Sequence, residues 1–120
     1  MHRYLVAAGL LLACAGAGEA AADYYGAIAY SPSTKAYGFS YDYPSRGAAE
    51  NEALSRCRSQ ASDCTVPLRF RNACGALAIG SDGYGTGWGT DRGIAEQYAI
   101  RVCRQHTQGC AVTRWVCTTR

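Results

Sequence analysis

Cysteine is the residue type in this chain whose number points most directly to chemistry. The sequence has 120 residues and seven cysteines, and so high a content in a short chain indicates an oxidising compartment and a framework of disulfides. Six residues separate Cys57 from Cys64, and six separate Cys103 from Cys110. Zinc sites built on cysteine pairs use a closer spacing, so we expect disulfides and no metal site.

Groups suited to acid–base catalysis near neutral pH are scarce. His2 lies in the first segment of the chain, and His106 stands alone after a predicted helix, with no nucleophile motif beside it. A catalytic triad would have to use His106. A solvated histidine, favoured by the dipole at the end of the helix, is the simpler interpretation.

Two glutamates, Glu50 and Glu96, are the candidates for a pair of hydrolytic carboxylates. Each stands four residues after an arginine, Arg46 or Arg92, so a helical i,i+4 ion pair explains them more simply. The two arginines are also candidates for binding acidic groups, because a guanidinium in the first turn of a helix opposes the helix dipole. We expect no enzyme and no cofactor, and a small hydrolase that uses Glu50 or Glu96 is the least favoured alternative.

Aromatic residues give the strongest indication of binding. Beyond the first 22 residues the chain has eight Tyr, two Phe and two Trp, more than a core this small can bury, and Tyr and Trp are common anchors of binding surfaces. Arg69 and Arg71 alternate with apolar residues and predict a basic edge beside the aromatics. The candidate binding residues are Tyr37, Phe39, Tyr84, Trp88, Arg46 and Arg92.

Glycine alternates with larger residues in the segment 83–89, where Tyr84, Thr86 and Trp88 occupy the intervening positions. The segment lacks the residues that follow a phosphate-binding loop. Its alternation instead predicts a strand with glycines on one face, where a helix could approach closely, and larger side chains on the other.

An internal duplication organises these residues. Residues 45–58 and 91–104 lie 46 positions apart and are identical at seven of fourteen positions. Chance does not explain so ordered a match, and we expect one domain over residues 24–120, built from repeats at about 25–71 and 74–117.

The same duplication continues towards the amino terminus at a wider interval. Residues 26–29 match residues 75–78 at an interval of 49, and the same interval pairs Gly38-Phe39 with Gly87-Trp88. This places a three-residue difference in length between the paired strands and the helix.

Each repeat is predicted to contain strand, strand, helix and strand. Turn residues separate the first two strands, and Ser45 and Asp91 are good N-caps for the helices. The strands are expected at residues 27–30, 36–41, 65–71, 76–79, 84–88 and 111–117. The fold class is therefore α+β, a small disulfide-stabilised domain of about six strands and two helices related by a pseudo-twofold axis.

Small residues recur every fourth position along both helices. Ala49, Ala53 and Cys57 form this face in the first helix, and the second helix repeats the pattern 46 residues later. We expect each helix to lie close to its sheet through this face.

The duplication also suggests how six of the cysteines pair, although six cysteines allow fifteen connectivities. Symmetry favours one short link in each repeat and a third between the two cysteines that remain, each of which we expect to close a third strand. The predicted disulfides are Cys57–Cys64, Cys103–Cys110 and Cys74–Cys117.

The first 22 residues are typical of an export signal. A short basic start precedes an apolar run over residues 4–13, too short to span a membrane, and Ala20-Ala21-Ala22 suits cleavage before Asp23. Alternatively, Leu11-Leu12-Ala13-Cys14 resembles a lipobox, in which case residues 1–13 are removed, Cys14 is lipidated and residues 14–23 form a tether. Either route removes Cys14 from the thiols.

Several motifs of the mature region resemble a known bacterial family. They include Tyr25-Gly26-Ala27-Ile28-Ala29-Tyr30-Ser31, Ala36-Tyr37-Gly38, Asn72-Ala73-Cys74-Gly75-Ala76-Leu77-Ala78, Gly87-Trp88-Gly89 and the helices of the form Ala-Glu-x-x-Ala-x-x-x-Cys. Over about residues 25–117 the chain is similar to the family known as domain of unknown function 4189. The resemblance implies a small exported protein of bacterial envelopes, and it carries over no catalytic residues.

These observations favour an exported binding module of the periplasm or the extracellular space. The formal net charge of +3 is too small to indicate nucleic acid, and a membrane would be engaged only through a lipid at Cys14. A protein of the envelope is the expected partner, met by an aromatic and arginine surface. A cell-wall or surface glycan is the alternative, and a further one is an inhibitor or immunity protein against a secreted hydrolase.

Overall fold

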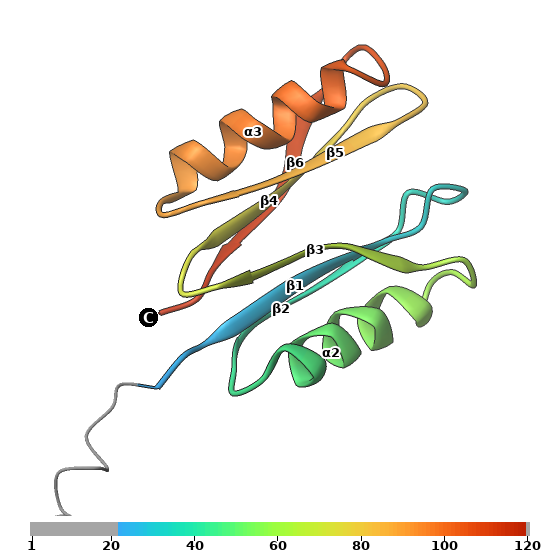
Figure 1. Cartoon of the computed structure of the whole chain (residues 1–120). Helices are drawn as coiled ribbons and strands as arrows, with labels where there is room; N and C mark the ends of the chain where they lie inside the picture. Colours follow the sequence, from blue (N-terminus) through green and yellow to red (C-terminus); the bar gives the residue numbers. More distant parts are fainter. Residues whose placement is uncertain (1–21, 120) are drawn as a thin grey trace, which may run out of the picture.

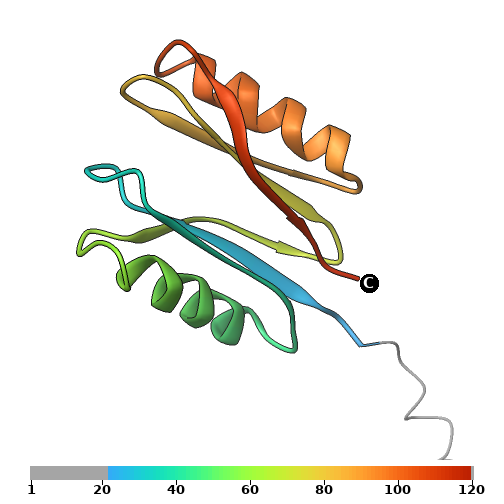
Figure 2. The same cartoon turned by 180° about the vertical axis from the view of Figure 1, so that it is seen from behind.

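Two three-stranded antiparallel sheets pack face to face, and one helix covers the outer face of each (Figure 1). The computed structural model describes residues 22–119. Seen from behind, the same four layers follow in the order helix, sheet, sheet, helix (Figure 2). The predicted signal segment, with Cys14, lies outside the described residues, apart from Ala22.

The two repeats have the same elements in the same order, as the sequence predicted. The first sheet has the strand order β2-β1-β3 and the second has the order β5-β4-β6. The first repeat consists of β1 (Tyr25–Tyr30), β2 (Tyr37–Tyr43), α2 (Arg46–Arg58) and β3 (Thr65–Arg71). The second consists of β4 (Cys74–Ile79), β5 (Tyr84–Gly89), α3 (Arg92–Arg104) and β6 (Ala111–Cys117).

Side-chain caps begin both helices where the sequence predicts them. The Ser45 hydroxyl accepts a hydrogen bond from the Ala48 amide at 3.2 Å, and the Asp91 carboxylate accepts one from the Ile94 amide at 2.9 Å. Each cap satisfies an amide that the first turn leaves without a partner. The small faces are buried against the sheets, and they consist of Ala49, Ala53 and Cys57 in α2 and Ala95, Ala99 and Cys103 in α3.

The core between the two sheets is built from both repeats. Ile28 and Leu77 are fully buried there, with Leu68 and Val116 beside them. The Phe70 ring lies between the two sheets, where a Cβ added at Gly26 or at Gly75 would come within 2.5 Å of it. Neither repeat covers this core alone, so the two repeats form one domain.

The junction between the repeats is short. β3 ends at Arg71, and β4 begins at Cys74 after Asn72 and Ala73. Asn72 has a left-handed backbone with φ 49°, which asparagine tolerates better than most residues. Its side-chain oxygen accepts a hydrogen bond from the Tyr24 amide at 2.9 Å, so the turn is fixed to the beginning of the first repeat.

The three predicted disulfides are confirmed, namely Cys57–Cys64, Cys74–Cys117 and Cys103–Cys110. The expected position of Cys74 is wrong, however. Cys74 does not close the third strand of the first repeat but begins β4, where it lies directly opposite Cys117 of β6. The third disulfide therefore joins two neighbouring strands within the second repeat.

The pairing of Gly38-Phe39 with Gly87-Trp88 is also wrong. A Cβ at Gly38 would meet the carbonyl oxygen of Ala53, and a Cβ at Gly85 would meet that of Ala99, the equivalent residue of α3. Gly38 therefore corresponds to Gly85, and the strand registers agree, since Gly38 lies opposite Ala29 and Gly85 opposite Ala78. Counting along β2 and β5 from that pair, the remaining correspondences are Phe39 with Thr86, Ser40 with Gly87, and Tyr41 with Trp88.

The physical reason lies in the length of the first repeat. Its turn between β1 and β2 is two residues longer than the turn between β4 and β5. A third extra residue enters near the end of β2, where the register with β1 shifts and Asp42 has φ 63°.

No helix of residues 22–119 has the length and apolar character needed to cross a membrane.

Candidate binding site at one edge of the sandwich

The sandwich has two long edges at which strands from different repeats meet. At one edge β3 lies near β5, and at the other β2 lies near β6. The pseudo-twofold axis exchanges these two edges. We call the edge of β3 and β5 the open edge and the edge of β2 and β6 the closed edge.

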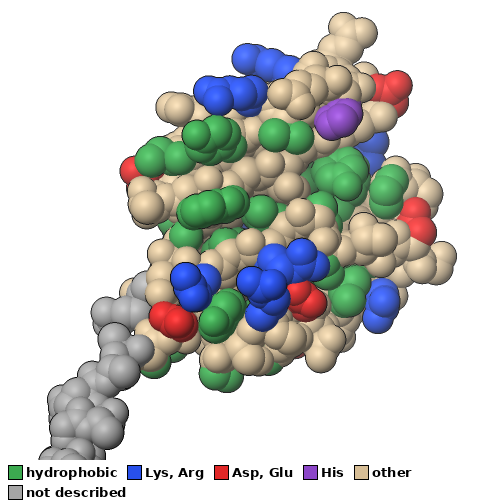
Figure 3. All heavy atoms as spheres, in the orientation of Figure 1, with side chains coloured by type: hydrophobic (Ala, Val, Ile, Leu, Met, Phe, Trp, Pro, Cys, Tyr) green, Lys and Arg blue, Asp and Glu red, His purple; other side chains and the backbone are tan. Residues whose placement is uncertain are grey.

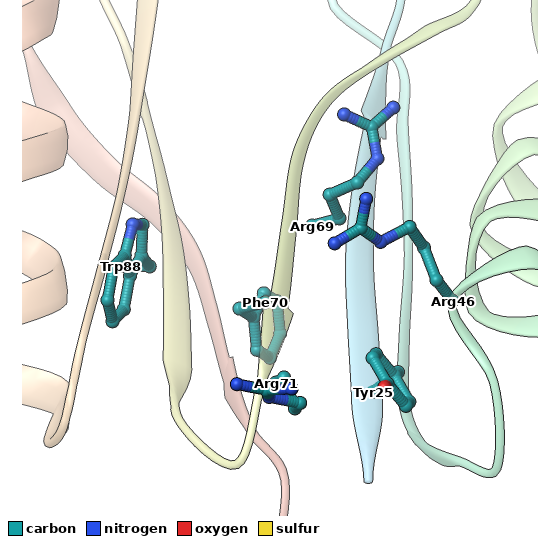
Figure 4. Close-up of a pocket in the computed structure, with 6 residues that line it drawn as sticks. All are labelled: Tyr25, Arg46, Arg69, Phe70, Arg71 and Trp88. Atoms are coloured by element: carbon teal, nitrogen blue, oxygen red, sulfur yellow. The ribbon is translucent and has the colours of Figure 1, made fainter. Parts of the chain in front are cut away.

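A cleft of about 500 Å³ lies at the open edge. Figure 4 shows Trp88 of β5 on one side of it, Arg46 of α2 on the other, and residues of β3 between them. The cleft combines three guanidiniums with three aromatic rings, and its lining residues are Tyr25, Arg46, Arg69, Phe70, Arg71 and Trp88.

The three arginines of the cleft are not equally engaged. The Arg69 guanidinium donates to the Glu50 carboxylate of α2, and an Arg71 guanidinium nitrogen lies 3.8 Å from an Asp23 carboxylate oxygen. Arg46 is exposed and has no ion pair, hydrogen bond or ring contact within residues 22–119. The expected ion pair of Arg46 with Glu50 is therefore wrong, because Glu50 turns to the strand beneath its helix.

The equivalent arginine of the second repeat is fully engaged. Arg92 pairs with Glu96 at 2.8 Å, as the sequence predicted, and its guanidinium lies 4.1 Å from the centre of the Trp115 ring. Trp115 occupies the position that Arg69 has in the first repeat. Trp115 carries no charge, so Glu96 pairs with Arg92. In the first repeat Arg69 pairs with Glu50 instead, and Arg46 has no partner within residues 22–119.

A second hollow, of about 480 Å³, continues from Trp88 along α3. Ile94, Tyr98 and Val102 follow one another at intervals of four residues and form its helical wall. Trp88 is 56% exposed and Tyr98 is 47% exposed, values that are high for large aromatic side chains. We call this hollow the apolar groove, and Trp88 borders both it and the arginine cleft.

The equivalent positions at the closed edge carry one small and two charged residues. Ala48, Glu52 and Arg56 of α2 replace Ile94, Tyr98 and Val102, and Arg56 pairs with Glu52 at 2.7 Å. The Arg56 guanidinium also lies 5.0 Å from the centre of the Phe39 ring. An ion pair and a guanidinium thus cover the surface that the second repeat leaves apolar and exposed.

Phe39 has a further guanidinium over its ring. Arg114 of β6 lies 3.8 Å from the ring centre, a favourable cation–π geometry. The corresponding residues at the open edge are Thr86 in place of Phe39 and Leu68 in place of Arg114. The smaller, uncharged Thr86 lines the apolar groove. Phe39 instead lies under two guanidiniums and, with Arg56, lines a hollow of about 490 Å³ at the closed edge.

The structure therefore brings together only two of the residues predicted to bind. Trp88 and Arg46 line the same cleft, and Figure 3 shows hydrophobic side chains across the second repeat beside Lys and Arg side chains of the first. The predicted basic edge is also present, since Arg69 and Arg71 line this cleft.

The other four predicted residues lie elsewhere. Tyr37 and Phe39 line a separate hollow at the closed edge, and Arg92 is held by Glu96 and Trp115 as described. Tyr84 lies on the same face of β5 as Trp88, but it is half-buried against the core and packs on Tyr30, with ring centres 4.4 Å apart. Burial raises the pKa of Tyr30, and the neighbouring Tyr84 raises it further.

The acid–base candidates do not form a common site. Glu50 belongs to α2 and Glu96 to α3, which occupy the two outer layers (Figure 1), so these carboxylates cannot flank one glycosidic bond. His106 is exposed just after α3. Within residues 22–119, no three metal-ligating side chains converge.

The apolar groove is what the sequence reasoning missed. A signal for it existed in the aligned helices, because Ile94, Tyr98 and Val102 follow at intervals of four where the first repeat has Ala48, Glu52 and Arg56. Identical positions establish the duplication, and it is the differing positions on one helical face that locate the groove.

Comparison with known proteins agrees with this fold. The family model described as domain of unknown function (DUF4189) matches residues 25–117. Protein Rv1269c of Mycobacterium tuberculosis is 40% identical over 97 residues, which are 81% of this chain and 72% of that protein. Protein Rv1813c of the same species is 35% identical over 94 residues, 78% of this chain and 60% of that protein.

A solved structure extends the comparison. The NMR structure of Rv1813c from Mycobacterium tuberculosis is similar with a TM-score of 0.59 and 33% sequence identity, covering 78% of this chain and 74% of that one. The same arrangement of repeats is therefore present in a relative of known structure.

Proposed function

The chain belongs to the DUF4189 family, and on that premise we propose that it is an exported, non-enzymatic binding module that engages a protein partner through the open edge. The observation that carries the proposal is the exposure of Trp88, at 56%, between the unengaged Arg46 and the apolar groove. Tryptophan and arginine are the residue types that most often anchor protein interfaces.

The difference between the two edges supports this choice of surface. The fold itself does not require an exposed tryptophan or an unpaired arginine, because the closed edge has the same backbone with its arginines held on Phe39 and Trp115. Exposed apolar surface and unpaired charge weaken solubility and stability rather than increase them. The closed edge also exposes aromatic surface, since Tyr41 of β2, the equivalent of Trp88, is 49% exposed. The open edge combines an exposed tryptophan with an arginine that has no partner within residues 22–119, and a binding role accounts for that combination.

A protein partner fits the apolar groove better than a glycan does. Ile94, Tyr98 and Val102 offer aliphatic and aromatic surface along the whole helical wall. Apolar side chains of a partner gain free energy there by burial, whereas the hydroxyl groups of a sugar would lose hydrogen bonds with water. The rigid disulfide framework also keeps the entropic cost of binding low.

Export is supported by the state of the cysteines. All six cysteines of residues 22–119 form disulfides, which persist in oxidising compartments. The intact mass of the protein isolated from its host would identify the processing route. Cleavage before Asp23 and lipidation of Cys14 predict different masses, and an unprocessed chain in the reducing cytosol would contradict export.

The binding proposal can be tested by affinity capture from detergent-solubilised envelope of the native host. The oxidised protein is immobilised beside two variants, Trp88→Ala at the open edge and Trp115→Ala at the closed edge. We expect one or more envelope proteins to be retained by the wild type and by Trp115→Ala, and to be lost with Trp88→Ala. Mass spectrometry identifies what is retained.

Two controls make the result decisive. Circular dichroism and intact disulfides must show that both variants fold, and each retained protein must bind the wild type again after purification. Equal retention by Trp88→Ala would contradict the open edge as the binding surface.

A glycan remains a second candidate because an exposed tryptophan ring can stack on a sugar. Peptidoglycan sacculi incubated with the same three proteins separate the two functions. Pelleting of the wild type that is lost with Trp88→Ala would replace the protein partner by a cell-wall glycan as the ligand.

A further inference from the structure

The arginine cleft and the apolar groove adjoin at Trp88 and differ in their chemistry. Trp88 is a wall of both, so a ligand that covers its exposed ring extends naturally into each. Both volumes, about 500 and 480 Å³, lie within the range of sites that accept a few side chains.

The basic end selects for negative charge. Within residues 22–119, Arg46 has no partner and Arg69 and Arg71 have one carboxylate partner each, with Arg71 at 3.8 Å from its partner. A guanidinium fork binds a carboxylate through two parallel hydrogen bonds. A ligand carboxylate beside Arg46 would therefore pair with a guanidinium that no carboxylate of residues 22–119 already neutralises.

The apolar end selects for hydrophobic side chains. Ile94 and Tyr98 are exposed, and Val102 lies half-buried behind them. Glycines at positions 87 and 89 complete the floor on the strand side. Among residues 22–119, no charged side chain lines this groove, although the Arg101 guanidinium lies 5.1 Å from the centre of the Tyr98 ring. An uncharged polar segment would therefore lose hydration along most of the groove without gaining a partner.

From these two ends we infer that the open edge recognises a peptide segment of its partner that carries acidic side chains at one end and apolar side chains at the other. This inference rests on the proposed function and adds the chemistry of the partner to it. Neither end alone specifies the ligand, and Trp88 fixes the distance between them by contacting the middle of the segment.

The first repeat supplies a way to remove one end without disturbing the fold. Changing Tyr98→Glu together with Val102→Arg gives α3 the residues that α2 has at Glu52 and Arg56, which pair at 2.7 Å. Because the helix already tolerates this pair in the first repeat, the double variant should fold and close the apolar groove. Arg46→Gln removes the charge at the other end, and Arg92→Gln is its matched control at the closed edge.

The test is selection from a displayed library of random peptides of about 12 residues, which span roughly 40 Å when extended. The oxidised protein is the target, and clones that also bind Trp88→Ala are discarded. We expect the enriched peptides to combine aspartate or glutamate at one end with leucine, isoleucine or aromatic residues at the other.

Synthetic versions of the enriched peptides then test each end by binding assays at low and high salt. Arg46→Gln should weaken binding by about tenfold and reduce its dependence on salt, because a charge pair is screened. The groove double variant should weaken binding by a similar factor with the salt dependence unchanged. Arg92→Gln should leave both quantities as they are.

Three results would overturn the inference. They are enrichment of peptides without acidic residues, binding that Arg46→Gln or the groove double variant leaves unchanged, and no enrichment at all. Capture of envelope proteins that depends on Trp88 would, in each case, leave the proposed function standing. Conversely, peptides of the expected kind without a captured envelope protein would support the site chemistry and contradict the function.

Discussion

The open and closed edges share a backbone plan and differ in how their side chains are satisfied. At the closed edge Arg92 contacts Trp115 and Glu96, and Arg56 contacts Phe39 and Glu52. At the open edge Arg46, the equivalent of Arg92, contacts neither a ring nor a carboxylate of the described residues 22–119. The closed edge shows that this backbone can hold its arginines on aromatic rings, although the buried Nε of Arg114 has no hydrogen-bond partner within residues 22–119.

The same contrast extends to the strand ends beneath the helices. Tyr25 and Arg71 lie opposite each other in the first repeat, where the second repeat has the disulfide between Cys74 and Cys117. The disulfide Cys74–Cys117 thus occupies the position at which Tyr25 and Arg71 line the arginine cleft in the first repeat.

Removal of the Cys74–Cys117 disulfide should have the largest effect. Its two cysteines are 43 residues apart, whereas those of the other disulfides are seven apart. By loop entropy, Cys74→Ala with Cys117→Ala should lower the free energy of unfolding by about 4 kcal/mol, and Cys57→Ala with Cys64→Ala by about 2.5 kcal/mol. Guanidinium unfolding of the oxidised variants measures both, and the reverse order would show that chain entropy does not govern these links.

The aromatic residues of the two edges should differ in their contribution to stability. Phe39 lies under two guanidiniums and against the core, so Phe39→Ala should cost about 2 kcal/mol. Trp88→Ala should cost less than about 1 kcal/mol because more than half of that side chain is already in water. Thermal and denaturant unfolding compare the two variants. Equal losses would mean that Trp88 is a structural residue.

The equivalent arginines should differ by a smaller amount. Arg92→Gln removes an ion pair and a ring contact at the surface, which together contribute about 1 kcal/mol. Arg46→Gln removes no contact within the described residues and should change stability by less than about 0.5 kcal/mol. A double-mutant cycle of Arg92 with Trp115 isolates the ring contact, and a coupling near zero would contradict it.

The smallest effect is expected at Asp63, an exposed residue whose position corresponds to Gly109 in the second repeat. Hydrogen bonds from Ser31 and Ser33 lower the pKa of Asp63 below its ordinary value of 3.8. The folded state therefore gains stability above the pKa of the unfolded chain, and loses it as the pH falls through the lower pKa of the folded state.

Two measurements check this sign. An NMR titration of the Asp63 carboxyl carbon should have its midpoint below 3.8. The stability difference between wild type and Asp63→Asn should shrink as the solution is acidified through that midpoint. A midpoint above the ordinary value would remove Asp63 as a support of the turn after β1.

Local features of the fold were predictable from the sequence, and relations across the layers were not. The caps at Ser45 and Asp91 and the small faces of the helices depend on residues a few positions apart. The partner of Glu50 depends on Arg69, which is distant in sequence and reaches it only after helix and sheet have packed. The i,i+4 rule considers Arg46, four residues from Glu50, and does not consider Arg69, which is nineteen residues away.

The mistaken pairing of Phe39 with Trp88 has a related cause. Both residues follow a glycine, so the sequences match where the strands do not. The register shift near Asp42 and the longer turn between β1 and β2 are irregularities of the backbone. The pattern of residue types did not predict them. This pairing equated Phe39, whose ring lies under two guanidiniums, with the exposed Trp88.

The short junction at Asn72 and Ala73 has a consequence for how this surface could arise. A single repeat could cover its sheet face by pairing with an identical copy, since Ile28 and Leu77 occupy equivalent places in the shared core. In such a symmetric dimer every substitution would occur at both edges, so that an edge could be opened only by opening both. A continuous chain is free of that constraint. Joining the copies lets one edge hold its arginines on aromatic rings while the other edge exposes a tryptophan.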